Sequence, residues 1–400
     1  MLVKNGLAFV RGAFEQADVR IENGRVAEVG QLSAKAGEEI RDAQGLYVLP
    51  GFVDIHIHAF GGADCMRGEA DVRRMSTGLL QTGVAAFVPT TMSAYPQQTY
   101  DALSGIQAVV DRPEAHGAAV LGAHMEAPFL ALKYKGAQLG ECLQAPSMAA
   151  YDEMVRGLTC VRMMTLAPEL PGALEVIAEL KKRGVVTCAA HTAALAADIH
   201  AAADAGLTQI THLFNAQTPL HHREPGVPGA GLADDRIVVQ MIADGIHLHP
   251  DVLRVAAKCK GAQGVALISD SMEAAGLPDG QYDLGGQAVY VKDGAARLES
   301  GVLAGSTLLM HQAVKNMITL AGIAPEEVIP MATSTPADSV GAKGFGRIEP
   351  GSAGVLALMD GSWNFAGVIA YTDAKQGGMN SSRFCVDGTH KTGYDNHESS

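Results

Sequence analysis

The stretch "VLPGFVDIHIHAFGGAD", from Val48 to Asp64, places two histidines, His56 and His58, at the end of an apolar run and just before a glycine-rich segment. On a β-strand, residues i and i+2 point to the same side. Both imidazoles, together with Asp54, therefore leave one face of the predicted strand near its carboxyl end. Such a pair is either two hydrogen-bonded polar residues at a strand terminus or two ligands of a metal ion. The choice depends on whether further ligands occur elsewhere in the chain.

The pattern that follows this strand predicts the fold. From Pro50 onward, short apolar runs alternate with segments in which apolar residues recur at i, i+3 and i+4, and many of these segments end at glycine. The apolar runs include "GVAAFVPTT", "AAVLGAHMEAP", "CVRMMTLAPE", "GVVTCAAH", "LTQITH", "RIVVQMIADG" and "GVALISD". Eight strand–helix units across residues 51–320 are typical of a (β/α)8 barrel. A doubly wound open sheet is the alternative, but no GxGxxG follows the first strand.

The two ends of the chain predict a second, smaller unit. Residues 1–50 alternate in the manner of β-strands and are punctuated by the turn signals Asn5-Gly6 and Asn23-Gly24. Two strand-like segments, "GRIEPGSAGVLALMDGSW" and "AGVIAYTD", follow the barrel. We therefore expect residues 1–50 and 344–372 to form a small β-sandwich, residues 51–343 to form the barrel, and residues 373–400 to be a polar tail.

Composition and charge exclude several classes of function. With 48% apolar and 18% charged residues the chain supports a large core, and its net charge of −13 disfavours a nucleic-acid surface. No run approaches the roughly 20 apolar residues that span a bilayer. No CxxC pair occurs among the six cysteines, which suits reduced thiols and a cytoplasmic location; they are Cys65, Cys142, Cys160, Cys188, Cys259 and Cys385.

Six residues of metal-ligand type stand where predicted barrel strands end. In such barrels the reactive groups come from the carboxyl ends of several strands. The residues are His56, His58, Glu126, His191, His212 and Asp270. Core packing alone rarely produces this joint placement, so the metal interpretation is favoured. Imidazole and carboxylate suit a divalent ion such as zinc, iron, manganese or cobalt.

A metal site of this kind indicates hydrolytic chemistry. The ion polarises a carbonyl and lowers the pKa of a water to about 7. Asp270, after the last barrel strand, is placed to accept the proton of that water and to pass it to a leaving amine. A plain ligand role for Asp270 is compatible with this one.

Consecutive motifs of the chain resemble one family. "HMEAPF", "KGAQ", "AAHTAA", "THLFNAQTPLHHREPGVPGA", "ADGIHLHP", "SDSMEAAG" and "LAGSTLLMHQAVKNM" are similar, in unbroken order over about residues 1–360, to the N-acetylglucosamine-6-phosphate deacetylases of the amidohydrolase superfamily. The resemblance implies hydrolysis of the acetamide of an amino-sugar 6-phosphate to acetate and the free amine. It implies one metal on Glu126, His191 and His212, a second on His56 and His58 shared through Glu126, and Asp270 as the acid/base.

The same resemblance implies the substrate contacts. Arg223 and His247 would hold the phosphate or sugar hydroxyls, and an arginine fork suits phosphate geometry. The remaining implied contacts are Ala137, Gln138, Asn215, Ala216, Leu303, Ala304 and Gly305. The chain departs from the family at Gln138, where the usual motif is KGAH, and at Ala127, where a glycine is usual. Glutamine still forms hydrogen bonds but does not titrate near neutrality.

Other interpretations remain open at this point. Dihydroorotase-like cyclic amidases bridge two metals with a lysine from strand 4, and "CVRMMTLAPE" has none. The N-acetylgalactosamine-6-phosphate epimer and other N-acyl substrates fit the same motifs. A catalytically silent binding protein predicts the loss of a ligand or of the acid/base, which the sequence does not show. Relatives of this kind are often dimers, so we expect a homodimer.

Overall fold

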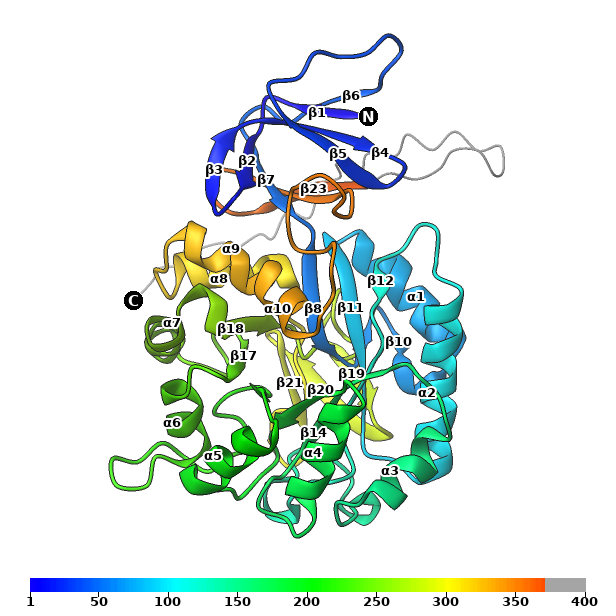
Figure 1. The fold of residues 1–400 in the computed structure, drawn as a ribbon, viewed down its shortest axis with the longest axis vertical. Helices are drawn as coiled ribbons and strands as arrows, with labels where there is room; N and C mark the ends of the chain where they lie inside the picture. Colours follow the sequence, from blue (N-terminus) through cyan, green and yellow to red (C-terminus); the bar gives the residue numbers. More distant parts are fainter. Residues whose placement is uncertain (371–400) are drawn as a thin grey trace, which may run out of the picture.

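The computed structural model describes residues 1–370. Figure 1 shows a small β domain, at the top, stacked on a larger domain in which helices surround a barrel of strands. The chain passes from the first domain into the second at Gly51 and returns through its last strands. The predicted tail, residues 373–400, and Cys385 lie outside the described residues.

The small domain consists of two sheets that enclose an apolar core. One sheet has the order β5-β4-β1-β6 and the other the order β23-β22-β7-β2-β3. The strands of the first sheet are β1 (Leu2–Lys4), β4 (Asp18–Glu22), β5 (Arg25–Gly30) and β6 (Ile40–Asp42). Those of the second are β2 (Leu7–Val10), β3 (Ala13–Gln16), β7 (Tyr47–Pro50), β22 (Val355–Met359) and β23 (Phe365–Ala370). Because β22 pairs with β7, segments that precede and follow the barrel share one sheet.

The larger domain is a nearly closed barrel of eight parallel strands. Its sheet runs β12-β11-β13-β14-β15-β16-β17-β18, and β8 pairs with β11. The eight barrel strands are β8 (Phe52–Ile57), β11 (Val84–Thr91), β13 (Ala123–Met125), β14 (Val161–Leu166), β15 (Val186–Ala189), β16 (Gln209–Ile210), β17 (Val238–Ile242) and β18 (Val265–Ile268); β12 (Ala119–Val120) lies beside β11. The seam is closed by the Asp54 carboxylate, which accepts hydrogen bonds from the backbone N–H (3.2 Å) and hydroxyl (2.5 Å) of Ser269.

Helices follow the barrel strands and cover the outside of the barrel. They are α1 (Glu69–Leu80), α2 (Pro96–Asp111), α3 (Met148–Val155), α4 (Ala173–Lys182), α5 (Ala196–Ala205), α6 (Gly226–Ala233), α7 (Pro250–Gly264), α8 (Met310–Thr319), α9 (Pro325–Ala332) and α10 (Ser334–Ser339). Short elements among them are β9 (Ala59–Phe60), β10 (Ala63–Asp64), η1 (Cys65–Arg67), η2 (Leu132–Tyr134) and η3 (Gly140–Cys142). Local chemistry sets their ends: the Ser147 hydroxyl accepts a hydrogen bond from Ala150 N at the start of α3, and Gly206 ends α5.

The sequence analysis did not predict a three-stranded sheet inserted between β18 and α8. It consists of β19 (Gly280–Leu284), β20 (Gln287–Lys292) and β21 (Ala295–Leu298), and we call it the flap. Its turns at Gly285-Gly286 and Asp293-Gly294 have the composition of tight hairpins. The flap packs through a cluster that includes Leu284 and Val289 against methionines of the barrel.

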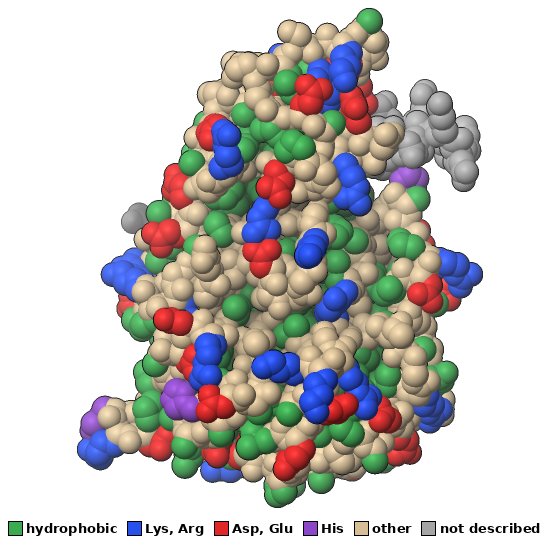
Figure 2. Space-filling view, in the orientation of Figure 1, with side chains coloured by type: hydrophobic (Ala, Val, Ile, Leu, Met, Phe, Trp, Pro, Cys, Tyr) green, Lys and Arg blue, Asp and Glu red, His purple; other side chains and the backbone are tan. Residues whose placement is uncertain are grey.

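The prediction of a (β/α)8 barrel with a small β-sandwich built from both ends of the chain is confirmed. The boundaries at residues 50 and 343 stay predictions. Within residues 1–370, no helix has both the length and the apolar character that crossing a membrane requires. On the face drawn in Figure 2, basic and acidic side chains are interspersed.

Candidate active site

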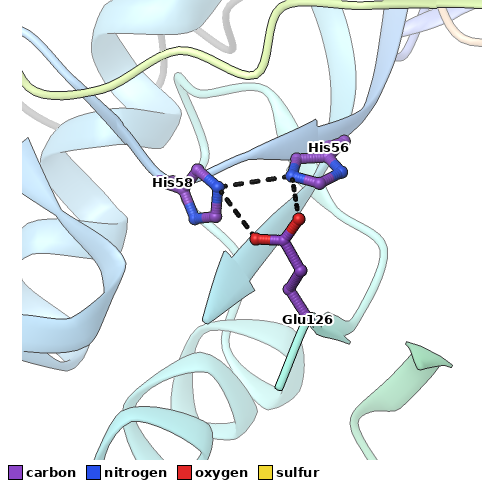
Figure 3. Close-up of side chains that lie close together, drawn as sticks. All are labelled: His56, His58 and Glu126. Carbon is purple, nitrogen blue, oxygen red and sulfur yellow. Dashed lines mark hydrogen bonds and ion pairs between the residues drawn. The ribbon is translucent and has the colours of Figure 1, made fainter. Parts of the chain in front are cut away.

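The two histidines of β8 lie at the carboxyl end of their strand. His56 and His58 are both buried, and their Nε2 atoms are 3.3 Å apart. Figure 3 shows both rings directed at the carboxylate of Glu126, which follows β13. The face of β8 that the sequence alternation predicted thus carries both imidazoles into the mouth of the barrel.

Glu126 lies between two pairs of histidines. Its Oε1 is 3.2 Å from His191 Nε2, 3.0 Å from His212 Nε2 and 3.5 Å from His56 Nε2. Its Oε2 is 3.4 Å from His58 Nε2. His191 follows β15 and His212 follows β16, so four different strands bring these side chains together. Two groups that could hold a metal ion share Glu126, one with His56 and His58 and the other with His191 and His212.

Outer hydrogen bonds set the tautomers of three of the histidines. Nδ1 of His58 donates to Thr90 O (2.9 Å), and Nδ1 of His191 donates to Tyr134 O (2.9 Å). Nδ1 of His212 donates to Asn215 O (3.2 Å). A carbonyl oxygen only accepts, so each neutral ring turns a lone pair on Nε2 toward the cluster.

When the rings are neutral, the inward-facing nitrogens carry no protons with which to hydrogen-bond one another. The Nε2 atoms of His191 and His212 are 3.1 Å apart, and neither neutral ring has a hydrogen to donate to the other. Carboxylate oxygens surround the same space and also accept only. A donor set of this kind fits a divalent cation, which matches the predicted ligands.

Asp270 closes the cluster from the side of β18. Its Oδ1 lies 3.4 Å from His56 Nε2 and 3.2 Å from His58 Nε2. Its backbone N–H donates to His56 O at 2.9 Å, and this bond fixes the residue across the barrel seam. Asp270 adopts a positive φ of 48°, a conformation that non-glycine residues rarely occupy. The carboxylate therefore faces the same mouth as the histidines, as a predicted acid/base must.

The electrostatics of the cluster keep its carboxylates ionised. Burial opposes the charge on Asp270, but the neighbouring His56 and the hydrogen bond with His58 outweigh burial and lower the pKa of Asp270 to about 2. The nearby histidines likewise hold the pKa of Glu126 well below its ordinary value despite burial. Burial lowers the pKa of His56 to about 4. Burial opposes the charge on His58, but the hydrogen bond with Asp270 and the nearby carboxylates outweigh burial and raise the pKa of His58 to about 9. A divalent cation bound among these side chains would take the place of that proton.

A cavity of about 840 Å³ opens beside this cluster. Among the residues that line it are the predicted contacts Ala137, Gln138, Asn215, Ala216, His247, Leu303 and Gly305. Ala304 is fully buried behind that wall and is not among the lining residues. The Nδ1 atom of His247 is hydrogen-bonded to Asp244 Oδ2 at 2.6 Å, which fixes the orientation of the ring.

Arg223 lies apart from the cavity of its own chain. It is exposed on the loop between β16 and α6, where its guanidinium donates to His222 Nε2 at 2.7 Å, and it does not line the cavity. The structure of the single chain thus brings His247, but not Arg223, to the site. The predicted phosphate contact by Arg223 stays a prediction.

Sequence reasoning missed part of the cavity wall. The flap supplies Leu284, Gln287, Arg297 and Leu298, and the segment around η2 supplies Lys133, Tyr134 and Lys135. The flap had a signal in its glycine turns and in the alternation of "QAVYVK". No sequence signal indicated that η2 would line the cavity, because its position depends on contacts between distant segments.

The cyclic-amidase alternative finds no support at β14. This strand, Val161–Leu166, contains no lysine, and Glu126 occupies the position between the two pairs of histidines. The structure therefore agrees with the choice of Glu126 over a modified lysine as the group shared by two ions.

Comparisons with known proteins agree with this geometry. The Amidohydrolase family model matches residues 47–389. The N-acetylgalactosamine-6-phosphate deacetylase of Escherichia coli O157:H7 is 38% identical over 354 residues, which cover 88% of this chain and 92% of that protein. The N-acetylglucosamine-6-phosphate deacetylase of Bacillus subtilis is 38% identical over 307 residues, covering 75% and 77%.

A solved structure matches the whole architecture. A variant of the N-acetyl-D-glucosamine-6-phosphate deacetylase of Mycobacterium smegmatis, in complex with N-acetyl-D-glucosamine-6-phosphate, superposes with a TM-score of 0.86 at 30% identity and covers 92% of this chain and 97% of that one. With its barrel, its shared glutamate and its strand-end histidines, this chain belongs to the amidohydrolase family and, within it, to the N-acetylglucosamine-6-phosphate deacetylases.

Proposed function

We propose that this protein hydrolyses the acetamide of N-acetylglucosamine-6-phosphate to glucosamine-6-phosphate and acetate. The observation that carries the proposal is the convergence of four imidazoles and two ionised carboxylates beside a cavity large enough for a small molecule. Family membership supplies the reaction class, and the reaction suits amino-sugar catabolism or the recycling of cell-wall sugars. A catalytically silent protein is disfavoured because every predicted ligand and the acid/base reach the site.

The metal centre has defined ligands in this proposal. Glu126, His191 and His212 would hold one divalent ion, and His56 and His58, with Glu126, would hold a second. Asp270 faces both histidines of β8 and would ligate or border that second position. Zinc, iron, manganese or cobalt bound there would polarise the acetamide carbonyl and activate a water.

Asp270 moves the proton. Because its carboxylate is ionised and faces the mouth, it accepts the proton of the attacking water as the new C–O bond forms. It then gives this proton to the nitrogen as the C–N bond breaks, so that the sugar leaves as a free amine. The hydrogen bond from the backbone N–H of Asp270 to His56 O holds the carboxylate in this position.

The phosphate is assigned to His247, Asn215 and the backbone of Ala216, all on the cavity wall. Arg223 is exposed and outside that wall, so we propose that it reaches the phosphate from a second copy of the chain in a homodimer. This arrangement reconciles the predicted role of Arg223 with its place on the loop. A cytoplasmic location is part of the same proposal and agrees with the free thiols of the five cysteines in residues 1–370.

The test measures acetate release by the metal-reconstituted protein from three sugars. They are N-acetylglucosamine-6-phosphate, its galactosamine epimer and unphosphorylated N-acetylglucosamine. We expect the first to be the best substrate by kcat/KM; the similarity to the Escherichia coli enzyme makes the epimer the second candidate. Equal rates with and without phosphate would contradict the roles of His247 and Arg223. Inactivity on all three sugars with metal bound would move the search to other N-acyl compounds.

A further inference from the structure

Gln138 is a buried amide with a defined orientation. It lines the cavity where the family usually has histidine, yet its side chain is almost fully enclosed. Its Oε1 accepts a hydrogen bond from Ser93 N at 2.7 Å, and its Nε2 donates to Glu126 Oε2 at 2.8 Å. A backbone N–H only donates, so the atom facing Ser93 is the oxygen and the NH2 group faces Glu126.

The oxygen and the nitrogen of the Gln138 amide therefore both form hydrogen bonds within the protein. The Ser93 bond fixes the acceptor and the Glu126 bond uses one donor hydrogen, at a group that also borders Met92 Sδ at 3.7 Å. An amide does not titrate, so the bond to Glu126 persists at any pH at which the protein is folded. The predicted contact of Gln138 with the sugar stays a prediction, and these hydrogen bonds point to a further role.

The bond makes the two oxygens of Glu126 unequal. Oε1 lies closest to His212 and His191, at 3.0 and 3.2 Å, with His56 farther away at 3.5 Å, and the Gln138 amide does not donate to it. Oε2 lies 3.4 Å from His58 Nε2 and already accepts a hydrogen bond from the Gln138 amide, which leaves it less electron density to offer a cation. A cation beside His58 thus meets the poorer of the two oxygen donors.

The histidines show the same asymmetry. Both His191 and His212 donate Nδ1–H to a backbone carbonyl, an arrangement that orients a ligand and raises its basicity. On the other side only His58 has such a partner. In the described part of the chain, the buried Nδ1 of His56 has no hydrogen-bond partner.

We propose that Gln138 is a positioning residue that holds the Glu126 carboxylate and thereby makes the two cation positions unequal. The position of His191 and His212 fills first, and the position of His56 and His58 fills more weakly. This inference rests on the proposed metal-dependent function. In this role Gln138 does not need to touch the substrate. It acts through Glu126, the ligand that both cation positions share.

The experiment titrates Co²⁺ into the metal-free full-length protein and follows heat and the visible spectrum of the bound ion. Two binding constants that differ by about tenfold or more are expected, because an outer partner of a ligand changes affinity by roughly 10–100-fold. Gln138→Met keeps the length of the side chain and removes the donor. It should remove the competing donor at the weaker position and loosen the carboxylate at the tighter one, so that the two constants approach each other and the spectrum changes.

Two further variants separate positioning from packing. Gln138→His restores a donor and is expected to recover the unequal constants. Gln287→Met is the matched control: the Gln287 amide donates to the neighbouring Ala137 O, so its loss should leave both metal constants unchanged. Equal constants in the unaltered protein, or constants and spectrum unmoved in a folded Gln138→Met, would overturn the inference alone. A protein that binds no divalent ion would overturn the proposed function as well.

Discussion

The two ends of the barrel strands carry opposite kinds of residue. At the carboxyl ends, buried histidines and carboxylates such as His56, Glu126 and Asp270 meet. At the amino ends, where β8 and β11 begin, small and apolar residues press against the second sheet of the small domain. A Cβ on Gly51 would lie 2.6 Å from Ala85 Cβ and 2.9 Å from Val355 Cγ1.

The residues at the carboxyl ends serve activity, and those at the amino ends serve the stability of the fold. Burying two carboxylates of like charge and a nitrogen without a hydrogen-bond partner opposes folding. These groups lie at the mouth of the barrel because they form the site. The amino ends gain stability from close packing and touch no reacting group. Changes at the mouth should therefore reduce activity far more than stability, and changes at the other end should do the reverse.

The largest expected effect is at the mouth. Asp270→Asn removes the proton acceptor while keeping the shape of the side chain, so kcat should fall by about 10²–10⁴-fold. Metal content should stay nearly intact, because four imidazoles and Glu126 remain. The melting temperature should fall modestly, because the imidazoles stabilise the charge of Asp270, as its lowered pKa shows, and the amide carries no charge. Acetate release, metal analysis and thermal unfolding measure the three quantities. Near-normal turnover would remove Asp270 from the mechanism.

The reciprocal change is Gly51→Ala, at the junction of the two domains. The added methyl group would meet Ala85 and Val355 at distances well below van der Waals contact, so the free energy of unfolding should fall by about 1–3 kcal/mol. The kcat of the folded protein should be unchanged. Gly361→Ala is the matched control, because a Cβ there has no heavy atom within 4 Å. Urea unfolding of both variants gives the comparison, and equal stabilities would show that the junction yields to an extra methyl group.

Much of the mouth was predictable because strand alternation and the order of a barrel are local rules. The alternation in β8 places His56 and His58 on one face, and each further ligand follows an apolar run that ends in a polar residue. Parallel strands then bring these ends together. The sequence therefore predicted, residue by residue, which histidines and carboxylates meet at the mouth of the barrel.

The parts that escaped prediction depend on long-range contacts. The bonds of Gln138 join it to Glu126 and to Ser93, 12 and 45 residues away, and no periodic pattern encodes them. The flap has local turn signals, but the barrel repeat supplies no place for three extra strands between β18 and α8. Whether the loop of Arg223 faces its own cavity is likewise decided by the path of the chain rather than by its motif.

The smallest expected effect concerns the contact between the small domain and helix α8 of the barrel. His311 on α8 stacks on Phe365 of β23, with ring centroids 4.7 Å apart, and burial, together with the charge of Lys315, lowers its pKa to about 4. In the unfolded chain the pKa is about 6.5. Between these values the unfolded state binds a proton that the folded state excludes, so stability is lost as pH falls from about 6.5 toward 4.

His311→Phe should keep the ring stack and remove that part of the acid sensitivity. The unfolding free energy of the variant should therefore fall less than that of the unaltered protein between pH 7 and pH 5, as measured by urea unfolding at each pH. His116→Phe, at an exposed histidine in the loop after α2, is the control and should leave the slope unchanged. Parallel pH profiles for His311→Phe and the unaltered protein would mean that this contact opens enough to hydrate the ring. The packing of the small domain on the barrel would then be looser than the close contacts around Gly51 imply.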